Sequence, residues 1–332
     1  MVHEPPQSHK PRVAVIVPAY NRADLLPQAV DSVLAQTFED WELVIADDAS
    51  SDDTYAVAAR YAERRPGKIT ALKLERNLGI AGARNEAIKA SRGGELVMLL
   101  DSDDYLREDY LEHMVGVYDR EVARGRRIGV VNCNALLDSP DGIMDETYAE
   151  FCCWSDEIDY DQMIKRNYLL ARVIFSQAAY DEVGPLSPEC MSWDDYDMWL
   201  RMLEAGYEVA TTRETVAYYR VHPGSITRNN EAFVARGGIV ALNRALERDA
   251  ISPRRRRAVK ARLRHLRALR ARGLFRDAVS RRQPLQASRW GLEAAPRGLV
   301  AFLQDPARWG EWAGDMRAAI SRRAPAARHA SH

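Results

Sequence analysis

The sequence predicts an α/β fold in which a mainly parallel sheet is flanked by helices. Short apolar runs rich in β-branched residues, such as 13–18, alternate with segments whose apolar residues recur at helical spacing. Strand and helix follow one another at short intervals, which is typical of parallel sheets with helices on both faces. The chain has 332 residues, of which 46% are hydrophobic, so it can bury a large core.

The elements are expected in a regular order along the first third of the chain. The predicted strands are 13–18, 41–46, 69–74 and 96–100, and the predicted helices between them are 25–34, 53–61 and 80–91. Because crossovers between parallel strands are right-handed, the loops after residues 17, 46 and 100 are expected along one rim of the sheet. Open α/β sheets bind their ligands at that rim.

The remainder of the chain gives shorter patterns. We expect a helix from Tyr105 to about Arg124, and we expect the acidic and aromatic stretch 137–160 to be an irregular, flexible loop over a site. The further predicted elements are strands at 128–132, 171–175, 207–210 and 215–221 and helices at 177–183, from 193 and from 230. In the basic tail we expect two to four helices, separated at Gly273, Pro284, Pro296 and Pro306.

Three carboxylates, Asp101, Asp103 and Asp104, follow directly after the apolar run 96–100. Like charges this close repel one another, and they are usually tolerated only with a cation or hydrogen-bond donors among them. One interpretation is a site for Mg²⁺ or Mn²⁺, which carboxylates and substrate phosphates would share. The alternative is a polar turn that caps the helix beginning near Glu108.

Charge and cysteine content limit the class of protein. Residues 251–332 contain 20 Lys and Arg against 5 Asp and Glu, although the net charge of the chain is −1, so the two parts are expected to have different tasks. The four cysteines lack metal-ligand spacing and fit a reducing compartment. Residues 1–11 have no apolar signal-peptide core and are expected to be a disordered lead-in. No apolar run approaches the length of a membrane span.

Six motifs in register make the chain resemble the family-two inverting glycosyltransferases, which are nucleotide-sugar enzymes with the GT-A fold. The motifs lie at 17–22, 45–50, 77–85, 99–104, 193–197 and 219–227. The resemblance covers about 12–228 and implies a GT-A catalytic domain there, with a nucleotide-binding half (12–104) and an acceptor half (105–228). Residues 229–332 would form a basic helical C-terminal region.

The resemblance implies roles for the residues around the carboxylates. Asp101-Ser102-Asp103 is similar to the Asp-x-Asp motif of the family, in which the last carboxylate binds the metal and the first contacts metal or ribose. The cation would act as a Lewis acid on the diphosphate leaving group. Asp104 is either a metal ligand or a residue that orients the ligands. His222 either completes the metal or diphosphate site or is only a loop residue.

The resemblance also implies residues that bind the donor nucleotide. Asp48 is similar to the carboxylate that accepts a hydrogen bond from the base, while Asp47 either takes that role or caps the turn. Asn21 is either a donor contact or a turn residue, and Arg84 either reaches the diphosphate or is a surface charge. The full set of predicted donor-binding residues is Pro18, Ala19, Tyr20, Asn21, Asp47, Asp48, Arg84, Asp101 and Ser102.

On the acceptor side, Asp194 and Asp195 correspond to the Glu-Asp pair of the family. We expect Asp195 to be the general base and Asp194 to position the acceptor, although Asp stands here where the family has Glu, which leaves the assignment open. The alternative is that the two acids only stabilise the start of the helix through its dipole. Trp193 is expected either to stack on an acceptor sugar or to belong to the core.

The predicted function is metal-dependent, inverting transfer of a sugar from a nucleoside-diphosphate donor, a UDP-sugar by preference, to a hydroxyl of a saccharide, lipid-linked or small-molecule acceptor. The alternatives are a nucleotidyltransferase, whose Gly-rich loop is absent from 18–22, and an inactive carbohydrate- or nucleotide-binding protein. The basic tail is either a solvated bundle, a homodimer contact or a peripheral membrane contact. We expect no nucleic-acid partner and a cytoplasmic location, with the inner membrane face left open.

Overall fold

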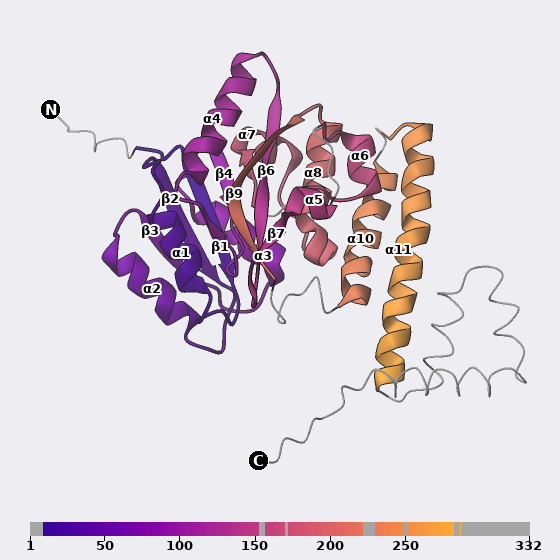
Figure 1. The fold of residues 1–332 in the computed structure, drawn as a ribbon, viewed down its shortest axis with the longest axis horizontal. Helices are drawn as coiled ribbons and strands as arrows, with labels where there is room; N and C mark the ends of the chain where they lie inside the picture. The colour runs from indigo at the N-terminus through magenta and orange to yellow at the C-terminus, as the bar shows by residue number, and fades with distance from the viewer. Residues whose placement is uncertain are drawn as a thin grey trace, which may run out of the picture. The chain divides into compact units, whose positions relative to one another are not determined.

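The computed structural model describes residues 9–152, 157–169, 172–221, 230–248, 251–281 and residue 286 (Figure 1). By its contacts the chain divides into two compact units, Met1–Arg264 and His265–His332. The first unit contains the sheet and the helices that flank it. Helix α11 (Pro253–Ser280) begins in the first unit and continues into the second. Among the described helices, none combines the length and apolar character needed to cross a bilayer.

Within the described part of the chain, one sheet of nine strands organises the first unit. The strands run in the order β3-β2-β1-β4-β8-β6-β9-β5, and β7 pairs with β6. Their bounds are β1 Val13–Ala19, β2 Trp41–Asp47, β3 Ile69–Lys73, β4 Leu96–Leu99, β5 Tyr105–Leu106, β6 Ile128–Ser139, β7 Gly142–Thr147, β8 Ile174–Ser176 and β9 Glu208–Arg220.

The N-terminal half of the sheet is parallel, as the alternation of strands and helices predicts. In the register, Val13 of β1 lies between Trp41 of β2 and Leu96 of β4. All residues of these three strands are buried, because helices cover both faces. Beyond β4 the sheet is mixed: β8 is antiparallel to both β4 and β6, β6 is parallel to β9, and β9 is antiparallel to β5. The parallel arrangement therefore holds for β1, β2, β3 and β4.

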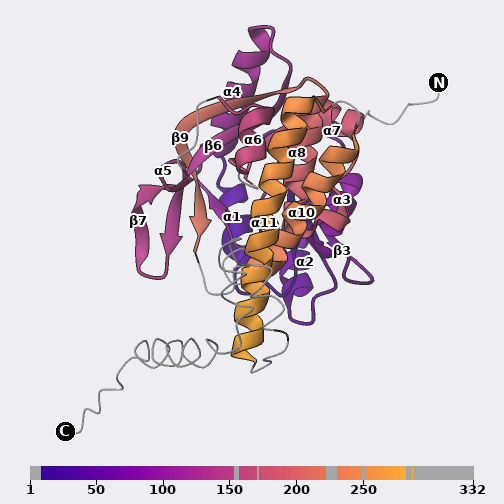
Figure 2. The ribbon, with the colours of Figure 1, turned by 90° about the vertical axis from the view of Figure 1, so that its right-hand side faces the viewer.

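Helices pack on both faces of this sheet (Figures 1 and 2). One face shares its buried cluster with α1, α2 and α4, while α3 packs against β1 and β2 from the other face. Helix α8 follows the 3-10 turn η1, and α10 packs against both. The helix bounds are α1 Leu26–Leu34, α2 Thr54–Arg64, α3 Gly79–Ala90, α4 Tyr110–Ala123, α5 Tyr148–Cys152, α6 Tyr160–Lys165, α7 Gln177–Val183, η1 Pro188–Trp193, α8 Asp194–Glu204 and α10 Glu231–Glu247.

Four expectations for the second half are wrong. The helix expected from Tyr105 begins at Tyr110, because Tyr105–Leu106 pair with β9 as strand β5. Much of 137–160 is regular, because β6 continues to Ser139, forms a hairpin with β7 and is followed by α5 and the start of α6. The strands expected at 207–210 and 215–221 are one strand, β9, which follows β6 through register shifts. Gly273 does not separate two helices, since α11 runs through it; a single glycine weakens a helix without ending it.

Candidate active site

The strands β1, β2 and β4 run in the same direction, so the loops after them meet at one edge of the sheet. Pro18 and Ala19 are buried and pair with Ala46 and Asp47. Tyr20 follows them and is 48% exposed. An exposed aromatic ring at this edge is suited to stacking on a planar ligand.

Asn21 links the loops that follow β1 and β2. Its Oδ1 accepts a hydrogen bond from the backbone N–H of Ser51 at 2.9 Å, and its own backbone N–H donates to Ser50 Oγ at 2.9 Å. Its φ is 51°, and that of Ala49 in the other loop is 57°. Residues other than glycine rarely adopt this left-handed backbone conformation, in which Asn is enriched. Asn21 therefore shapes the rim, and its contact with a donor stays a prediction.

Asp47 and Asp48 are both buried but have different surroundings. Asp47 Oδ1 accepts from the Ser50 amide at 3.3 Å, while its buried Oδ2 has no hydrogen-bond partner within the described residues. Asp48 Oδ1 accepts from the Leu78 amide at 2.6 Å, just before α3 begins. Burial raises the pKa of Asp48, and the backbone donors at Leu78 and Gly79 partly offset this effect.

Arg84 of α3 connects the two groups of carboxylates. It is 2% exposed, and its Nη2 donates to Asp101 Oδ1 at 2.7 Å while its Nη1 donates to Asp194 Oδ2 at 3.0 Å. Burial alone would lower its pKa, but the carboxylates of Asp194 and Asp101 outweigh burial and raise it. Arg84 is thus not a surface charge, and its contact with the donor diphosphate stays a prediction. It brings the end of β4 next to the start of α8.

Asp195 lies beside this ion pair without being part of it. Its Oδ1 accepts a hydrogen bond from the Tyr196 amide at 2.6 Å, and the residue is 8% exposed. Burial, and then the neighbouring carboxylate of Asp194, raise the pKa of Asp195 to about 7. A carboxyl group with such a pKa can take up a proton near neutral pH, which is what a general base requires.

The carboxylates after β4 form a cluster that is suited to a divalent cation. Oxygens of Asp101, Asp103 and Asp104 all lie within 4.8 Å of one another. Asp101 and Asp103 are partly exposed, and Asp104 is buried. Oxygen ligands at this spacing are the kind that Mg²⁺ and Mn²⁺ prefer. The residues present therefore fit a hard cation.

Asp104 is oriented by one partner that precedes β8 and another at the end of β9. One oxygen is ion-paired with Arg172, which is as buried as Asp104 at 2% exposure, and the other accepts from the Arg220 amide at 2.9 Å. The guanidinium of Arg172 also lies over the ring of Tyr219, 4.7 Å from its centre. Sequence reasoning missed Arg172, although a single charge within the apolar run 169–175 is a signal, since buried charges are almost always paired.

Three further residues were predicted for the site: Ser102, Trp193 and His222. Ser102 is buried at 7% exposure. Trp193 is half-buried and makes an edge contact with Tyr196, with ring centres 4.8 Å apart. His222 lies outside the described residues, so its predicted place at the metal site has no structural account.

The chain has relatives among known proteins. The model of the protein family "Glycosyl transferase family 2" matches residues 14–172. The UDP-Glc:alpha-D-GlcNAc-diphosphoundecaprenol beta-1,3-glucosyltransferase WfaP of Escherichia coli is 30% identical over 218 residues, which are 65% of this chain and 80% of that protein.

The chain belongs to glycosyl transferase family 2.

Solved structures show the fold of this family 2 member. The mannosyltransferase PcManGT from Pyrobaculum calidifontis, in complex with GDP-Man and Mn²⁺, is 20% identical, with a TM-score of 0.59 over 96% of this chain and 82% of that chain. TarS of S. aureus in complex with UDP is also 20% identical, with a TM-score of 0.55 over 81% of this chain and 72% of that chain. The chain is therefore a glycosyltransferase with the GT-A fold, as its motifs predict, and α10 and α11 form a C-terminal helical extension.

Proposed function

We propose that this glycosyltransferase transfers a sugar, with inversion and with the help of a divalent metal, from a nucleoside-diphosphate donor to an acceptor hydroxyl. The observation that carries the proposal is the ion-pair network Asp101–Arg84–Asp194. It places the carboxylates that suit a metal–diphosphate group beside those that suit an acceptor. Leaving-group stabilisation and proton removal are the two tasks of such a transfer.

Asp101 and Asp103 would hold the metal, Mn²⁺ or Mg²⁺. When bound, the cation supplies Lewis-acid stabilisation of the diphosphate leaving group. Asp104 acts as an orienting residue because Arg172 and the Arg220 amide occupy both of its oxygens. The Mn²⁺ in the PcManGT complex supports a metal in this fold.

Asp195 is the general base, and Asp194, which is ion-paired with Arg84, positions the acceptor. The two adjacent acids differ because Asp194 is ion-paired, whereas Asp195 has a pKa of about 7 and, among the described residues, no guanidinium bonded to it. The acceptor oxygen forms its bond to the anomeric carbon as the bond to the diphosphate breaks, and the hydroxyl proton passes to Asp195. Attack opposite the leaving group inverts the anomeric centre.

The nucleotide base binds at the rim formed by the loops after β1 and β2. Tyr20 stacks on the base, the backbone of Pro18 and Ala19 packs against it, and Asp48 accepts from a base N–H. Asp47 is the alternative, because one of its oxygens has no partner within the described residues. A UDP-sugar is the favoured donor, since WfaP uses UDP-Glc and TarS binds UDP. The GDP-Man complex makes a guanosine donor the second candidate.

Two substitutions separate the roles. For Asp195→Asn, the Kd of the donor measured with Mn²⁺ present should stay within about twofold of the wild-type value. Its kcat should fall by a factor of about 10³, because only the base is lost. In Asp103→Asn, or with EDTA, donor binding itself should fail. The measurements are calorimetric titration with UDP-sugars and single-turnover transfer.

The outcomes decide between the proposal and its alternatives. Turnover retained by Asp195→Asn would remove the base assignment. Wild-type protein that binds the donor and never transfers or hydrolyses it would favour an inactive nucleotide-sugar-binding protein. Transfer of a nucleotidyl group, with release of pyrophosphate, would indicate a nucleotidyltransferase instead.

A lipid-linked acceptor is the acceptor class that one specific observation favours. WfaP acts on a diphosphoundecaprenol-linked sugar, and α11 of this chain carries eleven Arg and Lys residues and one Asp. Basic helices are attracted to anionic lipid surfaces. We propose that α11 makes a peripheral contact with such a surface, where a lipid-linked acceptor would be found.

A further inference from the structure

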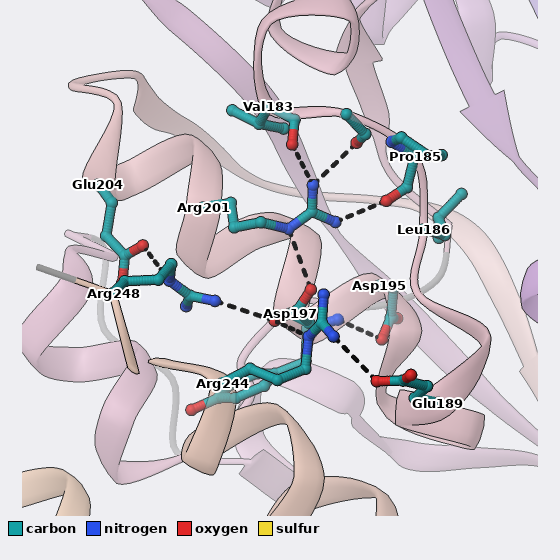
Figure 3. Close-up of polar contacts among 12 residues, drawn as sticks. Val183, Pro185, Leu186, Glu189, Asp195, Asp197, Arg201, Glu204, Arg244 and Arg248 are labelled. Carbon is teal, nitrogen blue, oxygen red and sulfur yellow. Dashed lines mark hydrogen bonds and ion pairs between the residues drawn. The ribbon is translucent and has the colours of Figure 1, made fainter. Parts of the chain in front are cut away.

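A fully buried carboxylate, Asp197, lies in the first turn of α8, close to the proposed base (Figure 3). Its Oδ2 accepts a hydrogen bond from Arg201 Nε at 3.0 Å, and its Oδ1 accepts from Arg248 Nη1 at 3.2 Å. Arg244 Nε lies 3.7 Å from the same Oδ1. Three guanidinium groups thus compensate one buried charge, and losing them would leave that charge unpaired.

Two of these arginines come from outside the segment that contains the acids. Arg244 belongs to α10, and Arg248 is its C-terminal cap residue. Arg244 also pairs with Glu189 of η1 at 2.9 Å, and Arg248 pairs with Glu204 at the end of α8 (Figure 3). Helix α10 is therefore tied by charge to η1 and to both ends of α8.

Arg201 extends the same network to the connection between α7 and η1. It donates to the carbonyl oxygens of Gly184 at 2.9 Å and Pro185 at 2.8 Å, and also to that of Val183 (Figure 3). Carbonyl groups left over at the end of α7 are satisfied in this way. The turn that leads into α8 is thus fixed on one side by Arg201 and on the other by α10.

Backbone contact is the second, independent link between α10 and this turn. A Cβ atom at Gly237 of α10 would lie 2.6 Å from the Cys190 carbonyl oxygen and 3.0 Å from Cδ1 of Trp193. Between these two residues Met191 has a φ of 51° and a ψ of −118°, a strained conformation that persists only where the surroundings enforce it. Because Gly237 has no Cβ, α10 can lie in close contact with the strained turn around Met191.

We propose that α10 is a positioning element of the enzyme: through Gly237, Arg244 and Arg248 it holds the strained turn and the first turn of α8, and so sets the place of Asp195. Asp197 is the positioning residue that transmits the charge contacts. None of these groups touches the reacting atoms. The inference rests on the proposed role of Asp195, and it makes α10 part of the acceptor side of the site.

The test compares two variants with matched controls. Arg244→Gln/Arg248→Gln removes the charge contacts, and Arg236→Gln removes an exposed arginine of the same helix. Gly237→Ala adds the clashing Cβ, and Gly116→Ala adds one to α4, where it would meet only the flexible end of Arg120 at 3.4 Å. The measurements are kcat, the Kd of the UDP-sugar with Mn²⁺, and hydrogen exchange of the amides at 190–198.

In the double arginine variant and in Gly237→Ala, kcat should fall at least tenfold with donor Kd within twofold. Exchange at 190–198 should accelerate, while amides of β1 and β2 stay protected. The two controls should match the wild type. The conservative variant Arg244→Lys/Arg248→Lys folds with its charges kept and should retain most of kcat, which separates positioning from loss of the fold.

Three results would overturn the inference: unchanged kcat, loss of donor affinity by the same factor as kcat, or unchanged exchange at 190–198 in both variants. Failure of the proposed function is distinguishable from these. Wild-type protein and Arg236→Gln would then transfer no sugar, and the exchange rates alone would still decide whether α10 holds the turn.

Discussion

At the scale of single residues, the neighbouring acids Asp194 and Asp195 show how one position changes the chemistry of a carboxylate. Both are buried at the start of α8, but only Asp194 is bonded to Arg84. Burial raises the pKa of Asp194 and the ion pair with Arg84 only partly offsets this effect, but the ion pair keeps the carboxylate engaged with a guanidinium. Asp195 carries the cost of burial and of its charged neighbour, which leaves its pKa at about 7.

The acid limb of the pH profile should report this pKa. The base works only when ionised, so kcat/KM should rise about tenfold per pH unit below the pKa and level off above it. The midpoint is expected at or below about 7, because a cation bound near Asp101 would favour the ionised form. Steady-state kinetics between pH 5 and 9 measure it.

Stability gives the control for this profile. A carboxyl whose pKa is raised in the folded state binds its proton more tightly there, so its contribution to stability is lost as pH rises toward 7. Asp195→Asn should therefore melt at a higher temperature than the wild type at pH 8, with the difference shrinking at pH 5. If kcat/KM did not change between pH 5 and 8, the assignment of Asp195 as the general base would be contradicted.

At the scale of elements, the end of β4 is oriented by strands that follow much later in the chain. Asp104, just after β4, is paired with Arg172, which precedes β8, and with the amide of Arg220 at the end of β9. These contacts cross 68 and 116 positions of sequence. Asp104, at the edge of the proposed metal site, therefore depends on the mixed half of the sheet for its orientation.

Removing Arg172 should destabilise the fold strongly. Arg172→Met leaves the carboxylate of Asp104 buried without its cation, so the free energy of unfolding should fall by about 3–5 kcal/mol. Lys89→Ala breaks an exposed pair with Glu86 and should cost less than about 1 kcal/mol. Urea denaturation measures both.

The double variant Asp104→Asn/Arg172→Met is the internal control for this pair. Because it removes the uncompensated charge together with its partner, it should recover part of the lost stability. Equal losses in the single and the double variant would mean that packing of the Arg172 side chain, and its contact with the Tyr219 ring, outweigh the charge.

At the scale of the whole molecule, charge is unequally distributed along the chain. Residues 251–332 contain 20 Lys and Arg against 5 Asp and Glu, although the net charge of the protein is −1. Along α11 the exposed ones recur at helical spacing, namely Arg254, Arg257, Lys260, Arg264, Arg267, Arg272 and Arg276. Such a helix provides attraction to an anionic surface without apolar insertion.

Vesicle binding tests this attraction. The full-length protein should sediment with phosphatidylglycerol vesicles at low salt and not with phosphatidylcholine vesicles. Arg257→Gln/Arg264→Gln/Arg267→Gln should weaken binding at least tenfold, since each basic residue near such a surface is worth about 1 kcal/mol. Arg236→Gln, an exposed change outside α11, is the control. Failure to bind the anionic vesicles would remove the membrane contact.

Local pattern was sufficient for most of the first half of the fold. The apolar runs predict β1, β2, β3 and β4 to within one or two residues, since a strand buried on both faces has few alternatives. Pattern was insufficient for 137–160, where β7 is wholly exposed apart from its last residue. An exposed hairpin carries no apolar alternation, so its pairing with β6 decides its structure.

The sequence by itself determined the family, the GT-A fold and the candidate residues, because six short motifs in register are specific even though each is weak. It did not determine which candidates would meet. Only the tertiary structure decided that Arg84 is buried between Asp101 and Asp194, that Arg172 pairs with Asp104, and that α10 contacts the turn before Asp195. The physical reason is that a charge can be buried only beside its partner, and these partners are far apart along the chain.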